Sequence, residues 1–243
     1  MNYEEFSEIF NTVLADNGLS HFAGETESRM FYQLTERMLQ VNRSMNLTAI
    51  KEERAVILRH YADSLTVAAF LPQNASVIDV GCGAGFPCLP LAICRPDLTI
   101  TALDSTEKRI RYVVETATLL QRERFSAIAA RAEELARTPG CREHFDCCTA
   151  RAVASLPILS ELCLPFVRVG GTFIAMKAAR GEEELQAAEK GIQKLGGAVA
   201  AIHRVTLHDG DEQDTRMLIE IKKVKATPPE LPRPFGKISK KPL

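Results

Sequence analysis

The sequence predicts an α/β fold in which a helical N-terminal region precedes a mostly parallel sheet. Three observations lead to this class. Apolar residues recur at helical spacing up to about residue 70, short apolar runs alternate with amphipathic stretches from Pro72 onward, and only a polar turn at 209–211 separates the last two runs. Alternating strands and helices imply right-handed crossovers and a parallel sheet with helices on both faces. The last two strands have no room for a crossover helix, so we expect them to pair antiparallel.

Residues 1–71 are expected to form the helical N-terminal region. Apolar side chains recur three and four positions apart within 6–14 and within 31–45, as they do on the buried face of a helix. A third helix is expected over about 52–70, with its apolar residues again on one face.

Residues 72–225 are expected to form the sheet domain. The runs that we expect to be strands are 77–80, 98–103, 125–130, 145–150, 172–177, 198–207 and 215–223. Helices are expected at 87–94, 106–120, 132–137, 156–166 and 182–195. Five prolines follow between Pro228 and Pro242, so the tail at 226–243 is expected to be extended and without regular structure.

Composition excludes several classes of protein. Of the 243 residues, 46% are hydrophobic and 25% are charged, which suits a globular protein with a sizeable core. No apolar run approaches the ~20 residues that span a bilayer, and the acidic N-terminus lacks the apolar segment of a secretory signal. We therefore expect a cytoplasmic protein that makes no use of a membrane. Seven cysteines without a Cys-x-x-Cys pair predict free thiols and no metal site.

The net charge of −1 gives no overall case for a nucleic-acid partner, but the charge is unevenly placed. Residues 222–243 carry seven basic groups against Glu230 alone, a net charge of +6. Such a tail fits a polyanionic partner, and it equally fits a solvated tail that aids solubility. Charge alone leaves both interpretations open.

A glycine-rich loop is the most informative stretch. The run VIDVGCGAGFP at 77–87 places Asp79 within an apolar strand, then Gly81, Gly83 and Gly85, and then Phe86 before a helix-starting proline. Glycines let the backbone turn sharply and approach a ligand closely, and the amides at the helix start face that ligand. The dinucleotide fingerprint Gly-x-Gly-x-x-Gly is disfavoured, because the third glycine comes one residue early.

This loop resembles motif I of the class I S-adenosylmethionine-dependent methyltransferases. The resemblance implies a Rossmann-like fold with a seven-stranded, mostly parallel sheet, an antiparallel last strand, and S-adenosylmethionine as the cofactor. Asp104 ends the second strand 25 residues after Asp79. A carboxylate there can accept hydrogen bonds from both ribose hydroxyls of the cofactor.

Two classes of methylated target lack their motifs. Methylases of exocyclic amines and of glutamine carry an (Asn/Asp)-Pro-Pro-aromatic motif after the fourth strand, where this chain has TARAV at 149–153. Cytosine-C5 methylases need a nucleophilic cysteine in that loop. Cys147 and Cys148 instead fall inside the predicted strand, so we interpret them as core residues.

Over about residues 25–243 the chain resembles the family of small-subunit ribosomal RNA methyltransferase G, also called GidB. The matching stretches are NLTAI at 46–50, RHYADS at 59–64, the glycine loop through residue 90, LDS at 103–105, KR at 108–109, ARAEE at 130–134, ARAVASL at 150–156, MK at 176–177 and KKPL at 240–243. The departures are mild: Met45, Cys82, Cys88 and Ala178 stand where the family usually has an aromatic residue, Thr or Ser, Gly, and Gly.

The resemblance implies transfer of a methyl group from S-adenosylmethionine to N7 of a guanine in 16S rRNA. The implied partner is 16S rRNA within the small ribosomal subunit or its assembly intermediate, and we expect a monomer. His60 and Asp63 are the candidate catalytic residues, together with Asn46. Spacing of i and i+3 places the first two on one helix face, where Asp63 could hold His60 in one tautomer. The third could bond the polar edge of the base, or simply be a turn residue.

Further residues are expected around the cofactor and the RNA. Arg151 follows a strand at the carboxyl edge of the sheet, where it could pair with the cofactor carboxylate, with a phosphate, or in a structural ion pair. Ala132 and Glu133 follow the third strand, where this fold usually meets adenine, although an acid there also suits a helix start. The candidate phosphate contacts are Arg131, Lys177, Arg233, Lys240 and Lys241.

Two other functions stay open at this point. One is a small-molecule methyltransferase on the same fold, and the other is a non-catalytic factor that binds RNA or assists ribosome assembly. The basic tail argues weakly against the first. The intact set of Asp79, three glycines and Asp104 argues against the second.

Overall fold

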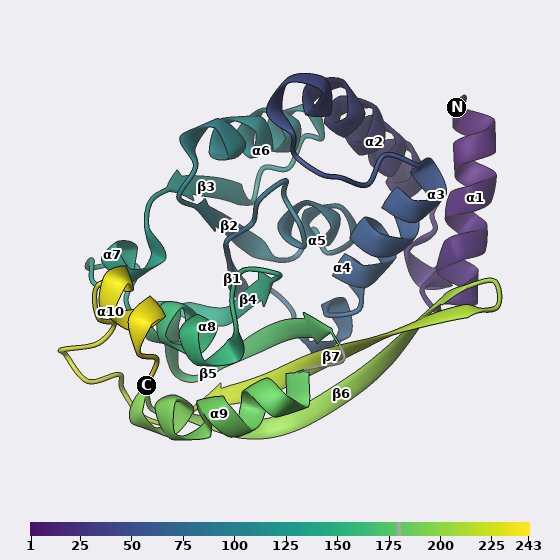
Figure 1. Ribbon diagram of the computed structural model, residues 1–243. Coiled ribbons are helices and arrows are strands. Elements are labelled where there is room, and N and C mark those ends of the chain that lie inside the picture. Colours follow the sequence, from purple (N-terminus) through teal and green to yellow (C-terminus); the bar gives the residue numbers. More distant parts are fainter. Residues whose placement is uncertain (179–180) are drawn as a thin grey trace.

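The computed structural model describes residues 1–178 and 181–243, and this part of the chain folds as a seven-stranded sheet between two layers of helices (Figure 1). The strands are β1 (Ser76–Val80), β2 (Thr99–Asp104), β3 (Phe125–Ala129), β4 (Phe145–Arg151), β5 (Val167–Ala178), β6 (Gly197–Asp209) and β7 (Glu212–Lys223). Their order is β3-β2-β1-β4-β5-β7-β6, and β7 runs antiparallel to both of its neighbours while the other pairs are parallel. The expected fold class and the antiparallel final pair are confirmed.

The strands are apolar on both sides because both faces of the sheet are covered. Val77 and Ile100 belong to the core under one helical layer, whereas Ile78 and Leu103 belong to the core under the other. Successive side chains of a strand point to opposite faces, so short runs of consecutive apolar residues serve both cores.

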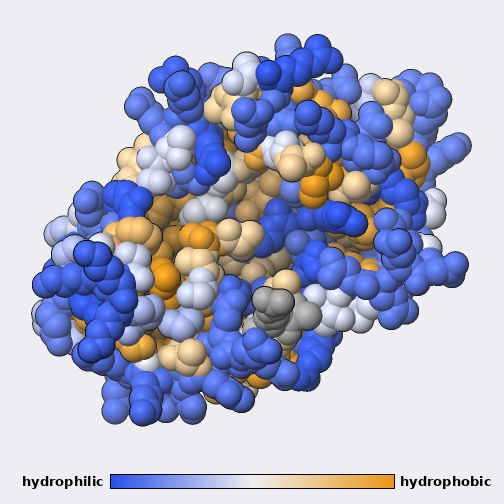
Figure 2. Space-filling view, viewed as in Figure 1, coloured by the Kyte–Doolittle hydropathy of each residue, from blue (hydrophilic) through white to orange (hydrophobic). Residues whose placement is uncertain are grey.

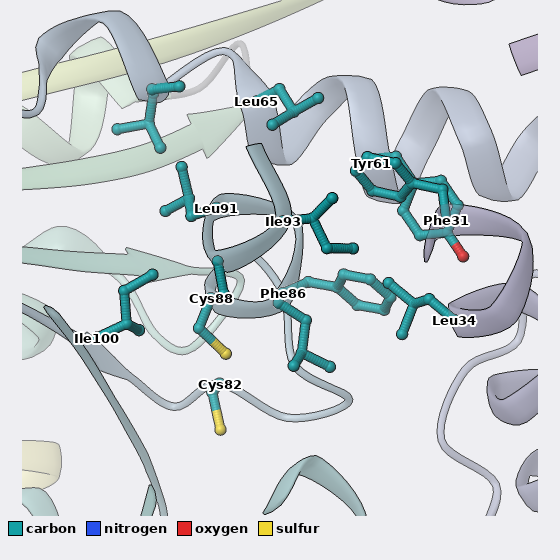
Figure 3. Close-up of a cluster of buried hydrophobic side chains, with 14 of the residues drawn as sticks. Phe31, Leu34, Tyr61, Leu65, Cys82, Phe86, Cys88, Leu91, Ile93 and Ile100 are labelled. Carbon is teal, nitrogen blue, oxygen red and sulfur yellow. The ribbon is translucent and has the colours of Figure 1, made fainter. Parts of the chain in front are cut away.

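One layer of helices holds the N-terminal region together with two helices that connect strands. It contains α1 (Tyr3–Asp16), α2 (Glu25–Met45), α5 (Cys88–Cys94) and α6 (Glu107–Leu119). Figure 3 shows Phe86 extending from the end of the glycine loop toward Leu34 and the rings of Phe31 and Tyr61. Their shared burial in one cluster fixes the N-terminal helices against the glycine loop.

The expected third helix is interrupted. It consists of α3 (Glu53–Val56), a π-helical segment η2 (Ile57–Ala62), α4 (Asp63–Leu65) and a 3₁₀ turn η3 (Ala68–Phe70). A π segment is wider than an α-helix because its hydrogen bonds run over five residues, and such segments are frequent at functional sites. The spacing rule used for His60 and Asp63 therefore does not apply.

The opposite layer contains α7 (Ala132–Leu135), α8 (Leu156–Cys163), 3₁₀ turn η4 (Leu164–Phe166), α9 (Gly181–Lys194) and α10 (Phe235–Lys240). A further 3₁₀ turn, η1 (Ser20–Phe22), connects α1 to α2 in the first layer. In the described part of the chain, no helix has both the length and the apolar character needed to cross a membrane.

The C-terminal tail differs from the expectation of an extended, irregular segment. It ends in α10, whose Ile238 is fully buried against the core. Before that helix, Arg142 donates hydrogen bonds to the carbonyls of Thr227 and Leu231, both at 2.8 Å, and Arg137 donates to that of Glu230 at 2.7 Å. Two arginines that are distant in sequence thus satisfy carbonyl groups that the proline-rich segment cannot pair internally.

Candidate functional site

A cavity of about 440 Å³ lies at the carboxyl ends of the parallel strands. Four loops line it, with residues from 81–86, 103–105, 130–133 and 151–154, and the N-terminal region adds Thr48 and His60. Figure 2, in the orientation of Figure 1, shows a hollowed face where apolar side chains lie between hydrophilic margins. Ligands of open α/β sheets bind in crevices at this edge.

The glycine loop presents backbone rather than side chains to the cavity. Gly81 and Gly83 have φ values of +75° and +56°, a region that favours glycine. A Cβ on Gly83 would meet no atom closer than 4.0 Å, so the space above it is open to a ligand. A Cβ on Gly81 would lie 2.5 Å from Val153 Cγ2, so this position needs glycine for packing.

Asp79 lies beneath the loop and does not line the cavity. Its carboxylate accepts hydrogen bonds from the Cys88 amide at 3.3 Å and from Thr149 Oγ1 at 3.1 Å. Burial raises the pKa of Asp79 to about 6. Gly85 is also outside the lining, and a Cβ there would lie 2.4 Å from Leu89. In this structure both residues, which were expected to bind the cofactor, support the conformation of the glycine loop from outside the cavity.

Asp104 is positioned at the end of β2 by two backbone amides. Its Oδ2 accepts a hydrogen bond from the Gly83 amide at 3.1 Å, and its Oδ1 accepts one from the Thr106 amide at 2.8 Å. Glu133 lies nearby in the lining, and its Oε1 accepts a hydrogen bond from Arg131 Nε at 3.1 Å. One end of the cavity therefore offers two fixed carboxylates to a ligand rich in hydroxyl or amine donors.

This donor and acceptor set fits S-adenosylmethionine. Carboxylate oxygens of Asp104 suit a ribose diol, and the open backbone cradle at Gly83 admits a ligand without a steric conflict. In residues 1–178 and 181–243, no cluster of three His, Cys, Asp or Glu side chains could hold a metal ion.

His60 forms the wall opposite the sheet. Its imidazole stacks on the ring of Phe86 with centroids 4.4 Å and planes 8° apart, and its Nε2 lies 2.9 Å from Thr48 Oγ1. Nδ1 is buried without a hydrogen-bond partner among the described residues. Burial, and then the positive charge of Arg151, lower the pKa of His60 to about 3. The ring is therefore neutral at physiological pH.

Asp63 does not orient His60, contrary to the sequence-based hypothesis. Its Oδ2 accepts a hydrogen bond from Arg151 Nη1 at 2.8 Å, and its Oδ1 accepts one from Arg216 Nε at 3.1 Å. The π-helical segment breaks the α-helical spacing of the two side chains. Asp63 therefore pairs with arginines of β4 and β7, whereas His60 contacts residues of two loops. Of the alternatives considered for Arg151, the structure contains the ion pair, although this arginine also lines the cavity.

Asn46 ends α2 in the left-handed conformation with φ of +50°, and it is exposed outside the lining. The residues directly after it, Leu47 and Thr48, reach the cavity instead. An asparagine is well suited to end a helix in this way. This position in the helix cap accounts for an asparagine without a substrate contact.

The five candidate phosphate contacts are placed differently from one another. Arg131 lines the cavity, and Lys240 and Lys241 are exposed at the end of α10. Lys177 donates to the Ala154 carbonyl at 2.8 Å and pairs with Glu184. Arg233 pairs with the fully buried Glu161, at 2.6 Å from Nη2 to Oε2. Lys177 and Arg233 are therefore engaged inside the protein.

The lining residues that sequence reasoning did not assign to the site include Thr48, Val153 and Phe235. The first lies in the NLTAI stretch, two positions after the candidate residue Asn46, which is outside the lining. The second follows Arg151 in a loop whose Ala152 has φ of +56°. The third had no signal, because it belongs to the tail that was expected to be irregular.

Comparison with known proteins decides the family. The family model GidB, described as rRNA small subunit methyltransferase G, matches residues 27–213. The chain belongs to the GidB family. A relative named ribosomal RNA small subunit methyltransferase G from Geobacillus sp. (strain WCH70) is 43% identical over 236 residues, or 96% of this chain and 98% of the relative. The GidB relative of that name from Bacillus subtilis is 41% identical over 245 residues, with 100% and 99% covered.

Solved structures support the fold of this GidB chain. TYW2 from M. jannaschii in complex with AdoMet superposes with a TM-score of 0.54 at 14% identity, covering 67% of this chain and 75% of that chain. The O-methyltransferase from Bacillus cereus in complex with SAH gives a TM-score of 0.52 at 17% identity, covering 78% and 91%. The GidB chain thus has the class I methyltransferase fold.

Proposed function

We propose that this protein transfers a methyl group from S-adenosylmethionine to N7 of a guanine in 16S rRNA of the small ribosomal subunit. The observation that carries the proposal is the cavity, where the loop carboxylate Asp104 and the neutral, stacked His60 face one space in a GidB family member. A small-molecule methyltransferase and a non-catalytic assembly factor remain outcomes of the test.

The sheet side of the cavity would hold the cofactor. Asp104 would accept hydrogen bonds from the ribose hydroxyls, Ala132 and Glu133 would border the adenine, and Gly81 and Gly83 would lie along the amino-acid portion. Arg151 lines the same cavity at the end of β4, and could bind the carboxylate of this portion while paired with Asp63. When bound, S-adenosylmethionine supplies an electrophilic methyl group on a positively charged sulfur.

The helical side of the cavity would position the guanine. N7 of guanine has a lone pair, so no general base is needed and catalysis can depend on orientation, which is worth up to ~7–11 kcal/mol. The His60 ring is held between Phe86 and the Thr48 hydroxyl, which gives it a fixed direction. A neutral imidazole adds no positive charge beside a purine that becomes cationic on methylation.

Exposed cations around the cavity would contact the RNA backbone. Arg131 pairs with Glu133 but its side chain is 43% exposed, and Lys240 and Lys241 are exposed as well, so these three remain candidates. Lys177 and Arg233 are excluded from the proposal because each is bound to a carboxylate of the fold and its side chain is at most 24% exposed. With a net charge of −1, the protein has little general attraction for naked RNA. We therefore propose that a monomer acts in the cytoplasm on the small subunit or its assembly intermediate.

Three segments of the chain would contribute different parts of the site. Residues 1–71 would form the guanine side, 72–225 the cofactor domain, and 226–243 a separate C-terminal segment. The N-terminal region carries His60 and Thr48, and the sheet domain carries Asp104 and the glycine loop.

The test is methyl transfer from methyl-labelled S-adenosylmethionine to unmodified small ribosomal subunits, followed by digestion of the RNA to nucleosides. The proposal expects label in 7-methylguanosine and much less label when naked 16S rRNA replaces the subunits. Label in another nucleoside would contradict the assigned atom. Binding of the cofactor without any label in RNA would favour one of the two alternative functions.

A further inference from the structure

The C-terminal tail folds back over the end of the cavity that lies beside β3. Phe235, the first residue of α10, lines the cavity together with Arg131 and Glu133. Figure 1 shows α10 beside α7, the helix that begins directly after Arg131. A segment at the end of the chain thus contributes to a cavity that is lined mainly by the ends of the first four strands, the loops that follow them and the helical region.

Phe235 is held in place without being buried. Its neighbours anchor the tail: Arg233 makes a two-pronged pair with Glu161, with Nε to Oε1 at 2.9 Å and Nη2 to Oε2 at 2.6 Å. Ile238, one helical turn later, is fully buried. Yet Phe235 itself remains 38% exposed, so part of its side chain is free to meet a ligand in the cavity.

The surroundings of the ring match a purine. The Arg131 guanidinium lies over the Phe235 ring with its carbon 4.5 Å from the centroid, a cation–π arrangement. Arg131 also donates to Glu133 Oε1 at 3.1 Å, and no described residue donates to the second carboxylate oxygen. An exposed aromatic ring can stack on a flat base. A carboxylate oxygen beside that ring can accept a hydrogen bond from the exocyclic amine of the base.

We propose that Phe235 is a cofactor-binding residue that contacts the adenine of S-adenosylmethionine, so that the C-terminal tail completes the cofactor site. The inference rests on the cofactor use assumed in the proposed function. It gives the tail a role in cofactor affinity that is separate from any contact between its lysines and RNA.

The experiment measures the Kd of the full-length protein for S-adenosylhomocysteine and for 5′-methylthioadenosine by titration calorimetry. Loss of base stacking on an aromatic side chain typically weakens binding by about tenfold or more. Phe235→Ala should therefore raise both Kd values by about tenfold, since both ligands contain the adenosine portion, whereas Phe235→Tyr should keep near wild-type affinity. Val169→Ala, which alters an exposed apolar residue outside the cavity lining, should change neither value.

A second background separates direct contact from an effect through Arg131. In an Arg131→Ala protein, Phe235→Ala should still weaken binding of S-adenosylhomocysteine, and loss of that effect would overturn direct contact. Equal affinity of wild type and Phe235→Ala, with equal thermal midpoints, would also overturn it while leaving the proposed function intact. Failure of the wild type to bind S-adenosylhomocysteine would overturn the proposed function, and this inference with it.

Discussion

The imidazole of His60 lies flat on the ring of Phe86, with centroids 4.4 Å and planes 8° apart. His60 belongs to the helical N-terminal region and Phe86 to the glycine loop, so this contact joins the two halves of the cavity. The hydroxyl of Thr48, from the loop after α2, fixes the edge of the same ring. A ring held on its face and on its edge is suited to orienting a base.

Removal of the His60 ring should reduce methyl transfer far more than it affects folding. His60→Ala is expected to lower kcat on small subunits by ~100-fold, because misplacement of a reacting group by about 1 Å can have an effect of this size. Single-turnover transfer of labelled methyl groups measures it. His21→Ala, an exposed histidine outside the lining, is the control. An equal fall in both variants would refute the positioning role.

Thr48 should act through His60. Thr48→Val removes the hydroxyl that contacts His60 Nε2 at 2.9 Å and that accepts the Ile50 amide at 3.1 Å. We expect kcat to fall by roughly fivefold, equivalent to one net hydrogen bond of ~1 kcal/mol. KM for S-adenosylmethionine should stay unchanged, and Thr48→Ser should restore kcat because it keeps the oxygen. A change in KM alone would assign the residue to cofactor binding instead.

Asp63 should contribute mainly to stability. Its carboxylate is buried between Arg151 and Arg216, and Asp63→Asn leaves two arginines without their shared counter-charge. Removing one partner of a buried ion pair typically lowers the free energy of unfolding by ~3–5 kcal/mol. Urea denaturation measures the free energy of unfolding of Asp63→Asn and of a control variant, Glu25→Gln. The control breaks an exposed pair with Arg29 and should change stability by less than ~1 kcal/mol. Similar losses in both would contradict the assignment.

Asp79 should make stability fall as the pH rises through mildly acidic values. Burial raises its pKa from 3.8 to about 6, so between these values the folded chain keeps a proton that the unfolded chain has lost. The stability of the wild type relative to Asp79→Asn should therefore fall by about 1 kcal/mol between pH 5 and pH 7.

Asp97→Asn provides the control of opposite sign. Hydrogen bonds from Arg95 lower the pKa of Asp97, so its contribution to stability changes only below its ordinary range. The difference between wild type and Asp97→Asn should be constant from pH 5 to pH 7. If the stability difference between wild type and Asp79→Asn is also constant over this range, then the carboxyl of Asp79 titrates normally and is not buried in solution.

Local patterns predicted the sheet and several of the residues that line the cavity. Asp104, Gly81 and Gly83 belong to a strand–loop–helix unit whose geometry follows from neighbouring residues, and the structure places all three at the cavity. The pairing of Asp63 could not be predicted in this way, because its partners Arg151 and Arg216 lie 88 and 153 positions away and a π segment breaks the helical spacing.

The tail shows the same limit. Its prolines indicated an extended segment, but its conformation is set by Arg137 and Arg142, which bind its carbonyls from elsewhere in the chain. The charge count treated Lys223 as part of a basic tail, whereas it is buried beside Glu143 at 3.0 Å. The net charge of +6 counted for residues 222–243 is therefore larger than the exposed positive charge that could contact RNA.

The most direct test is a crystal structure of the protein bound to S-adenosylhomocysteine. We predict that the ribose hydroxyls will lie within hydrogen-bonding distance of the Asp104 carboxylate, with the sulfur on the side of the cavity that His60 and Arg151 line. A ligand outside this cavity, or one whose sulfur faces Phe235 instead of His60, would contradict the account.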